Sequence, residues 1–399
     1  MKILVLNCGS SSIKYKMFDM SNSSVIAQGG IEKIGLPGSF LKFTMSNGEK
    51  VVLDKDIPEH TVGVQFVLDT LISKEYGCIS SFDEITAVGH RVVHGGEVFN
   101  KSVVITNEVV EQMKKCIDLA PLHNPANLKG IATIEKLLPK VPQVGVFDTA
   151  FHQTMPDYAY MYAIPYEYYT KHAVRRYGFH GTSHRYITLK AIEMLNLDPH
   201  NNKIITCHIG NGASIAAIQN GKTIDTSMGL TPVEGLMMGT RSGDIDAGAL
   251  TFLMDKENLD SKGISDMVNK KSGMIGVSGV SSDMREVDAA GKSGNERAKL
   301  AQNMYYYRIK KYIGAYAAAL GGVDAIIFTG GVGENQTLCR QQSCEGLQFI
   351  GVELDHEMNE KIHGEDMVIS TPSSKVKVVV IATDEEYMIA SDTKTLLNL

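Results

Sequence analysis

Two arginines, two histidines and an aspartate stand in segments that suit the handling of a small anion. Arg91 lies inside the apolar segment GHRVVHGGE, and Arg241 lies among small residues in MMGTRSGDID. A guanidinium is costly to bury alone, so a bound anion or a structural carboxylate is expected beside each. We expect His123 in a loop held rigid by two prolines, and His180 in a glycine-containing loop. Asp148 ends an apolar strand, the usual place for a working carboxylate in an open α/β sheet.

Three turns of small residues each follow an apolar strand: NCGSSSIK at 7–14, GNGAS at 210–214 and GGVGEN at 330–335. Such turns let backbone N–H groups approach phosphate oxygens. None matches GxGxxG or GxxxxGKS, so the common nucleotide motifs are absent. A single turn of this kind is more often structural, but three at equivalent strand ends favour a phosphate site. Lys14 follows the first turn as a candidate phosphate ligand, although an exposed strand lysine fits equally well.

An acidic segment near the C-terminus, ATDEEYMIA, follows the expected strand 377–382. Acidic residues at the start of a helix complement its dipole, which is one explanation. Beside phosphate turns they are also candidate Mg²⁺ ligands, and because magnesium often takes only one or two carboxylates, Glu385 alone could suffice.

Composition narrows the function classes. The chain has 399 residues with 45 acidic and 39 basic side chains, so its net charge is −6. That length suggests two or three domains, and the acidic balance argues against nucleic-acid binding. No apolar run approaches the ~18 residues of a membrane span, and the start lacks a secretory pattern, so a cytoplasmic protein is expected. The six cysteines form no CxxC pair and are expected to be reduced thiols.

Strands and turns repeat between the two halves of the chain. A strand, a small-residue turn and a second strand occur around Gly9 and again around Gly210, an offset of 210 − 9 = 201 residues. The repeat suggests a duplicated α/β domain. A strand after the glycines, where a dinucleotide fold has a helix, argues against a dehydrogenase. Further strands are expected at 87–93, 143–147, 203–209, 215–219 and 324–329, and helices at 62–76, 107–119, 127–138 and 295–320.

The chain resembles the acetate kinases, within the acetate and sugar kinase, Hsp70 and actin superfamily. The resemblance runs the whole chain through NCGSSSIK, HRVVHGGE, PLHNP, FDTAFH, YGFHGTSH, HIGNGAS, SMGLTPVEGLMMGTRSGDID, SSDMREV, GGVGEN and TDEE. It implies two ribonuclease-H-like βββαβαβα domains, 1–150 and 151–385, with a nucleotide cleft between them. A C-terminal helix at about 386–399 would pack back on the first domain. The implied reaction is reversible transfer of the ATP γ-phosphoryl group to acetate, giving acetyl phosphate and ADP.

The resemblance also implies roles for individual residues. The catalytic group would be Arg91, His123, Asp148, His180 and Arg241. The nucleotide ligands would be Asn7, Ser10, Ser12, Lys14, His208, Gly210, Asn211, Gly212, Asp283, Met284, Arg285, Gly331, Val332, Gly333 and Asn335. Acetate would contact Arg91 and an apolar pocket of Val93, Leu122, Phe179 and Pro232. Asn7 and Glu385 would hold Mg²⁺, with Mn²⁺ able to replace it, and the protein would be a cytoplasmic homodimer.

Two departures from the family pattern stand out: TDEE replaces the usual TNEE, which places Asp384 beside Glu385, and Ala247 replaces a proline after GDID.

A propionate or butyrate kinase of the same fold is the nearest alternative, because one methyl group discriminates by only ~1–3 kcal/mol. An actin-like or Hsp70-like ATPase is the alternative from another class. Such proteins have no use for two arginines around a small anion.

Overall fold

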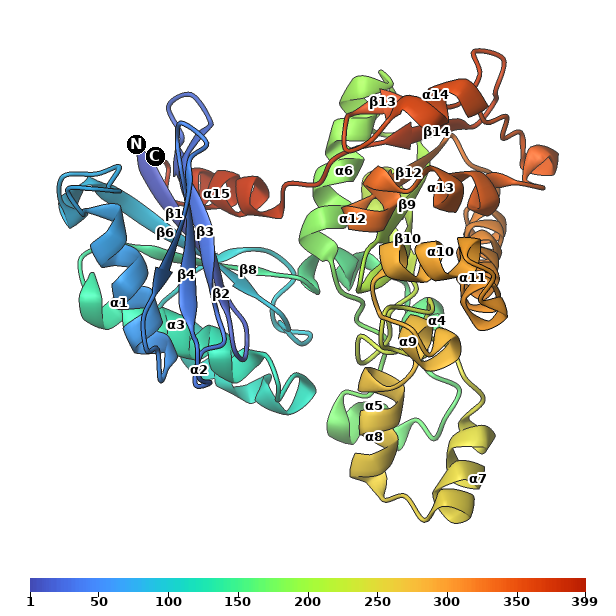
Figure 1. Ribbon diagram of the computed structural model, residues 1–399, viewed down its shortest axis with the longest axis horizontal. Coiled ribbons are helices and arrows are strands. Elements are labelled where there is room, and N and C mark those ends of the chain that lie inside the picture. The colour runs from blue at the N-terminus through green and yellow to red at the C-terminus, as the bar shows by residue number, and fades with distance from the viewer. The chain divides into compact units, whose positions relative to one another are not determined.

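The computed structural model describes residues 1–399 and divides into two compact units. Unit 1 contains Met1–Phe151 and Asp384–Leu399, and unit 2 contains His152–Thr383 (Figure 1). None of the helices combines the length and apolarity needed to cross a membrane. All six cysteines are unpaired, as expected from the sequence.

Unit 1 is built on an eight-stranded sheet in the order β5-β4-β3-β2-β1-β6-β8-β7. Neighbours from β1 to β5 are antiparallel, whereas β6 and β8 run parallel to β1. The strands are β1 (Lys2–Cys8), β2 (Ile13–Asp19), β3 (Ser24–Glu32), β4 (Phe40–Met45), β5 (Lys50–Asp54), β6 (Ile85–Val92), β7 (Val103–Val104) and β8 (Gln143–Phe147). The helices are α1 (His60–Leu71), α2 (Asn107–Lys115), α3 (Asn124–Leu137) and α15 (Glu385–Leu396).

Helices cover both faces of this sheet. Because side chains alternate along a strand, Leu4 and Leu6 of β1 join a core with α1 and α3, whereas Ile3 and Val5 join a second core with Ile389 of α15. The C-terminal helix therefore belongs to unit 1, where it packs against β1 and β6. This packing places α15 on the sheet whose strands β6 and β8 carry Arg91 and Asp148 at their carboxyl ends.

Unit 2 is built on a six-stranded sheet in the order β11-β10-β9-β12-β14-β13. Its strands are β9 (Lys203–Ile209), β10 (Ala213–Gln219), β11 (Lys222–Thr226), β12 (Ala325–Thr329), β13 (Met367–Val368) and β14 (Lys377–Val380). Three antiparallel strands followed by two parallel ones repeat the order β3-β2-β1-β6-β8 of unit 1. The duplicated α/β fold expected from the sequence is confirmed.

The helices of unit 2 pack around this sheet and extend beyond it. In Figure 1, α6 lies on one side of the strands and the long helix α11 on the other. The helices are α4 (Asp157–Tyr160), α5 (Glu167–His172), α6 (Gly181–Met194), α7 (Ala247–Glu257), α8 (Ser261–Lys270), α9 (Gly273–Ser278), α10 (Met284–Lys292), α11 (Glu296–Leu320), α12 (Gly330–Asn335), α13 (Thr337–Cys344) and α14 (His356–Lys361).

Three segments expected as loops are helix starts instead. Helix α3 begins at Asn124 inside PLHNP, because a proline in the first turn has no N–H to leave unpaired. Helix α6 begins at Gly181, directly after His180. The segment GGVGEN forms the short helix α12, whose first residue Gly330 turns the chain out of β12 with a φ of 78°.

We expect Gly89→Ala to destabilise unit 1. A Cβ atom on Gly89 of β6 would lie 2.6 Å from Ile389 Cγ2 and 2.6 Å from Thr393 Oγ1 of α15. Overpacking of this kind costs ~1–3 kcal/mol and outweighs the ~0.5–1 kcal/mol that alanine gains over glycine within a strand. The urea midpoint of unfolding should fall.

Gly145→Ala on the neighbouring strand β8 is the matched control, since its Cβ would meet nothing closer than 3.6 Å. Equal midpoints for the two variants would show that α15 does not pack tightly on β6.

Candidate active site

The Arg91 guanidinium of unit 1 is held by Asp148. Strands β6 and β8 are parallel neighbours, so Arg91 near the end of one and Asp148 after the end of the other meet at the same edge. Arg91 Nη2 donates to Asp148 Oδ2 at 2.6 Å, and Nε donates to both carboxylate oxygens at 3.0 and 3.1 Å. Of the two partners expected for Arg91, the structure therefore contains the carboxylate. Nη1 makes no hydrogen bond within the protein, and 23% of the Arg91 side chain stays exposed.

Glu385, the first residue of α15, lies beside this ion pair. Its Oε2 is 3.8 Å from Arg91 Nε. Loss of solvation raises the pKa of Glu385 to about 7, Arg91 partly offsets this, and the nearby Asp148 and Glu386 carboxylates raise it further. Negative charge is thus concentrated where a cation would stabilise it.

Asp384, the departure from TNEE, has structural partners of its own. Its carboxylate caps α15 by accepting a hydrogen bond from Tyr387 N at 3.0 Å. It also pairs with Lys16 Nζ at 2.9 Å, and the same ammonium lies 3.2 Å from Glu386. The extra negative charge is therefore balanced by a lysine of β2.

The first small-residue turn joins β1 to β2. Gly9 N donates to Ser12 O at 2.8 Å, which closes the turn, and Ser10 is exposed. Asn7 lies within β1 and Lys14 within β2, where the two residues face each other in the antiparallel register. The candidate phosphate ligands of unit 1 therefore lie on one hairpin.

His123 directly precedes α3, and its neighbour Leu122 is 71% exposed. Val93 directly follows β6 and is partly buried. The other two residues of the expected apolar pocket, Phe179 and Pro232, belong to unit 2. The four residues expected to form that pocket are therefore divided between the two units.

Arg241, His180 and the turn at Gly212 meet in unit 2. A Cβ atom on Gly212 would lie 3.5 Å from Arg241 Nη1 and 3.6 Å from His180 Nε2. The Arg241 guanidinium has no carboxylate partner, and its only hydrogen bond is a weak one to Met238 Sδ at 3.7 Å. Burial lowers the pKa of Arg241 from its ordinary value. This cation therefore lacks the counter-charge that an anionic ligand would supply.

A buried polar chain orients His180. The residue has a φ of 55°, a left-handed conformation that is uncommon outside glycine and clusters at functional sites. His180 Nδ1 and His184 Nε2 each lie 2.8 Å from Ser214 Oγ. The ring of His180 also stacks on His208, with centroids 4.2 Å apart. The Nε2 edge of His180 is thereby directed toward Gly212 and Arg241.

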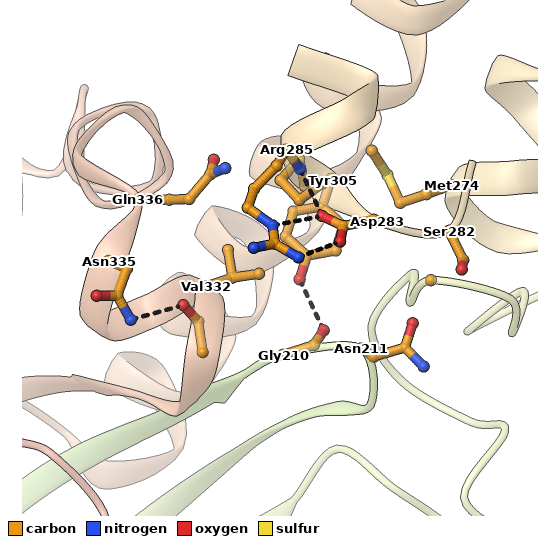
Figure 2. Close-up of a pocket in the computed structure, with 13 residues that line it drawn as sticks. Gly210, Asn211, Met274, Ser282, Asp283, Arg285, Tyr305, Val332, Asn335 and Gln336 are labelled. Atoms are coloured by element: carbon orange, nitrogen blue, oxygen red, sulfur yellow. Dashed lines mark hydrogen bonds and ion pairs between the residues drawn. The ribbon is translucent and has the colours of Figure 1, made fainter. Parts of the chain in front are cut away.

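A pocket of about 580 Å³ in unit 2 lies beside the ends of β9 and β12 (Figure 2). Its volume is typical of small-molecule sites. Figure 2 shows Arg285 paired with Asp283 on one side and Asn335, which donates to Gly331 O at 3.0 Å, on another. The lining residues that the sequence predicted are Gly210, Asn211, Asp283, Met284, Arg285, Gly331, Val332 and Asn335. His208, Gly212 and Gly333 do not line this pocket.

Sequence reasoning missed five lining residues: Gly239, Met274, Ser282, Tyr305 and Gln336. Tyr305 is 2% exposed and its hydroxyl donates to Gly210 O at 3.3 Å, so it ties α11 to the small-residue turn. Its helical spacing from the buried Ile309 indicates only a core position. A Cβ on Gly239 would lie 1.8 Å from Asn211 Oδ1, so the absent side chain at 239 leaves room for that amide.

Comparison with known proteins identifies the family. Residues 2–391 match the model of the acetokinase family. The chain is 70% identical over 397 residues to the acetate kinase of Bacteroides thetaiotaomicron, with all of both chains covered. The crystal structure of Porphyromonas gingivalis acetate kinase is similar with a TM-score of 0.97 at 65% identity over 99% of both chains. A propionate kinase from Francisella tularensis is similar with a TM-score of 0.92 at 42% identity, again over 99% of both. From the motifs, the duplicated fold and these full-length matches, the chain belongs to the acetokinase family.

Proposed function

We propose that this protein catalyses reversible transfer of the ATP γ-phosphoryl group to acetate, by direct in-line attack of the acetate carboxylate. The main support for this proposal is the environment of Arg241. Arg241 is a partly buried guanidinium without a carboxylate partner, next to His180 and the turn that ends β9. A transferring phosphoryl group is an anion that such a cation would bind.

The pocket beside β9 and β12 would hold the nucleoside of ATP. Arg285 and Asn335 offer hydrogen-bond donors at its walls, and Val332 and Met274 offer apolar contact. The Gly210–Gly212 turn adjoins this pocket, and its backbone N–H groups suit the phosphates. Nucleoside and phosphates would thus extend from the pocket toward Arg241.

Arg91 would hold the acetate carboxylate. A carboxylate attacks a triphosphate poorly because two anions repel, so positive charge is needed on both reactants. Asp148 binds the edge of the Arg91 guanidinium formed by Nε and Nη2 and leaves Nη1 for the acceptor. Acetate is already ionised at neutral pH, so Asp148 would orient Arg91 rather than remove a proton.

His180 would donate a hydrogen bond from Nε2 to the transferring phosphoryl group. Charge spreads over the equatorial oxygens of that group in the transition state, and a preoriented donor stabilises it. The Ser214 hydroxyl and the stacked His208 ring keep His180 in one orientation. The histidine would therefore act without moving.

Magnesium fits the acidic edge of unit 1. No three His, Cys, Asp or Glu side chains form a metal site, so an ion held here would rely on few protein ligands and on water and phosphate oxygens. Glu385, whose pKa is raised mainly by burial and further by the Asp148 and Glu386 carboxylates, and Asn7 are the residues that would hold it. When bound, the ion neutralises charge on the phosphates of ATP.

A homodimer in the cytoplasm completes the proposal. Helix α7 of unit 2 has no buried residue, and several large apolar side chains of the same unit are exposed: Tyr158, Ile164, Tyr166, Ile245 and Phe252. Exposed apolar groups of this extent favour a second copy of the chain as partner.

We expect Arg91→Ala and Arg241→Ala each to lower kcat by roughly 10²–10³-fold, the loss typical of removing one transition-state donor. KM for ATP should change little, because neither residue lines the nucleoside pocket. Acetyl hydroxamate formed from acetate, ATP and hydroxylamine measures the rates.

Arg285→Ala is the contrasting variant, because it removes a cation from the nucleoside pocket and should mainly raise KM for ATP. Turnover near that of the wild type in the Arg241→Ala variant would refute the proposed role.

We expect Glu385→Gln to raise the Mg²⁺ concentration needed for half-maximal activity, because the variant loses the carboxylate proposed as ligand. A titration at saturating ATP and acetate measures this.

Asp384→Asn is the matched control, since the amide can still cap α15 while its charge is removed. If Asp384→Asn shifts the titration and Glu385→Gln does not, the metal ligand has been assigned to the wrong residue.

We expect Val93→Ala to raise the propionate to acetate ratio of kcat/KM several-fold. The variant has a smaller side chain in one wall of the acyl pocket, which leaves room for a longer acid. Burial of the additional CH₂ of propionate contributes ~0.8 kcal/mol to binding. Most of the change should be in KM, because Arg91 still holds the carboxylate. Steady-state kinetics with both acids at saturating MgATP gives the ratio, and an unchanged ratio would remove Val93 from the pocket.

A further inference from the structure

One buried amide connects two segments of unit 1 that carry candidate site residues. Asn127, in the first turns of α3, is 2% exposed. Its Oδ1 accepts a hydrogen bond from Val93 N at 3.0 Å, and its Nδ2 donates to Cys8 O at 2.8 Å. Val93 follows the end of β6, and Cys8 precedes the turn of the first hairpin. The same side chain thus fixes the acyl-pocket wall and the candidate phosphate turn.

The two contacts require an amide. Val93 offers an N–H and Cys8 offers a carbonyl, so the side chain between them must accept on one atom and donate from another. A buried backbone group left without its partner costs ~1–3 kcal/mol. This pairing fixes the orientation of the Asn127 amide. In the flipped form, Nδ2 would face the Val93 N–H and Oδ1 would face the Cys8 carbonyl, so neither hydrogen bond could form.

Close packing of α3 on β1 lets so short a side chain reach the strand. Gly130 lies one turn after Asn127, and a Cβ atom there would be 2.6 Å from Cys8 Sγ. Helix α3 therefore approaches the end of β1 more closely than a larger residue would allow. The contact between Asn127 and Cys8 follows from that approach.

We propose that Asn127 is a positioning residue that sets the acyl-chain selectivity of the site by holding the backbone of Val93. The inference rests on the proposed function, in which Val93 bounds the acetate methyl group. When the Val93 N–H loses its acceptor, the backbone at Val93 itself is less firmly held, while Asn124 still binds His94, and the pocket admits a longer acid. Through Cys8, the same amide keeps the Gly9–Ser12 turn in place for ATP.

Asn124 provides a matched comparison on the same helix. It is 1% exposed, and its side chain binds the backbone of the residue after Val93, with His94 N at 3.2 Å and His94 O at 2.9 Å, and also donates to Cys116 O at 3.3 Å. Its removal deletes the same atoms from an equally buried position while the acceptor for Val93 N remains. The comparison therefore separates the contact to Val93 from a contact to the next residue of the same segment.

The test is kcat/KM for acetate and propionate, KM for ATP and thermal midpoint for Asn127→Ala and Asn124→Ala. We expect both midpoints to fall, but only Asn127→Ala to raise the propionate to acetate ratio several-fold and to raise KM for ATP. Equal ratios in the two variants would overturn the proposal and leave Asn127 a purely structural residue.

A second variant keeps the test decisive if Asn127→Ala does not fold. Asn127→Asp retains the acceptor for Val93 N but lacks the amide donor to Cys8 O, so KM for ATP should rise while the acyl ratio stays near that of the wild type. A shifted ratio here would contradict the assignment. Absence of acetate-dependent activity in the wild type would instead refute the proposed function.

Discussion

The ion pair between Arg91 and Asp148 is the constraint on which the proposed acetate site depends. Asp148 is 1% exposed, and burial of a charged group is costly unless the group is paired and hydrogen-bonded. The pair forms because β6 and β8 are parallel neighbours whose carboxyl ends share an edge. Burial alone would lower the pKa of Arg91, but Asp148 and Glu385 outweigh it and raise that pKa. The guanidinium is therefore a permanent and oriented charge.

Arg241 differs from Arg91 in having no carboxylate partner. Arg91 has a carboxylate partner and gains orientation from it, whereas Arg241 has none and remains available to a ligand. An oriented cation suits a substrate carboxylate that must be held at a fixed angle. An uncompensated cation suits a phosphoryl group whose charge spreads as it transfers. In the proposed function, Arg91 therefore serves the acetate carboxylate and Arg241 serves the phosphoryl group.

Sequence patterns predicted the regular strands well and the site-bearing helix starts poorly. The ranges 143–147 and 203–209 match β8 and β9 because each is a compact run of apolar residues bounded by turns. The starts of α3 and α6 carry proline, glycine and histidine rather than a usual capping residue, so periodicity alone placed them in loops. His180 directly before α6 has a left-handed conformation, which the local sequence did not predict.

The site residues show the same limit. Arg91 was recognisable as a cation in an apolar strand, but its partner depends on which strand pairs with β6. The role of Asp384 depends on Lys16, a residue 368 positions away in the chain. Tyr305 and Asn127 looked like ordinary helix residues, since what distinguishes them is their hydrogen bonds to backbone groups of other elements. Spacing predicts faces of helices and strands, whereas such contacts require the assembled fold.

Direct transfer is the central claim, because Arg91 and Arg241 are proposed to act on both reactants at once and no side chain is proposed to carry the phosphoryl group. The stereochemistry at phosphorus tests this most directly. With ATP made chiral at the γ-phosphorus by oxygen isotopes, a single in-line displacement by acetate inverts the configuration in acetyl phosphate. We expect inversion. Retention would require two displacements through a phosphorylated side chain and would contradict the account.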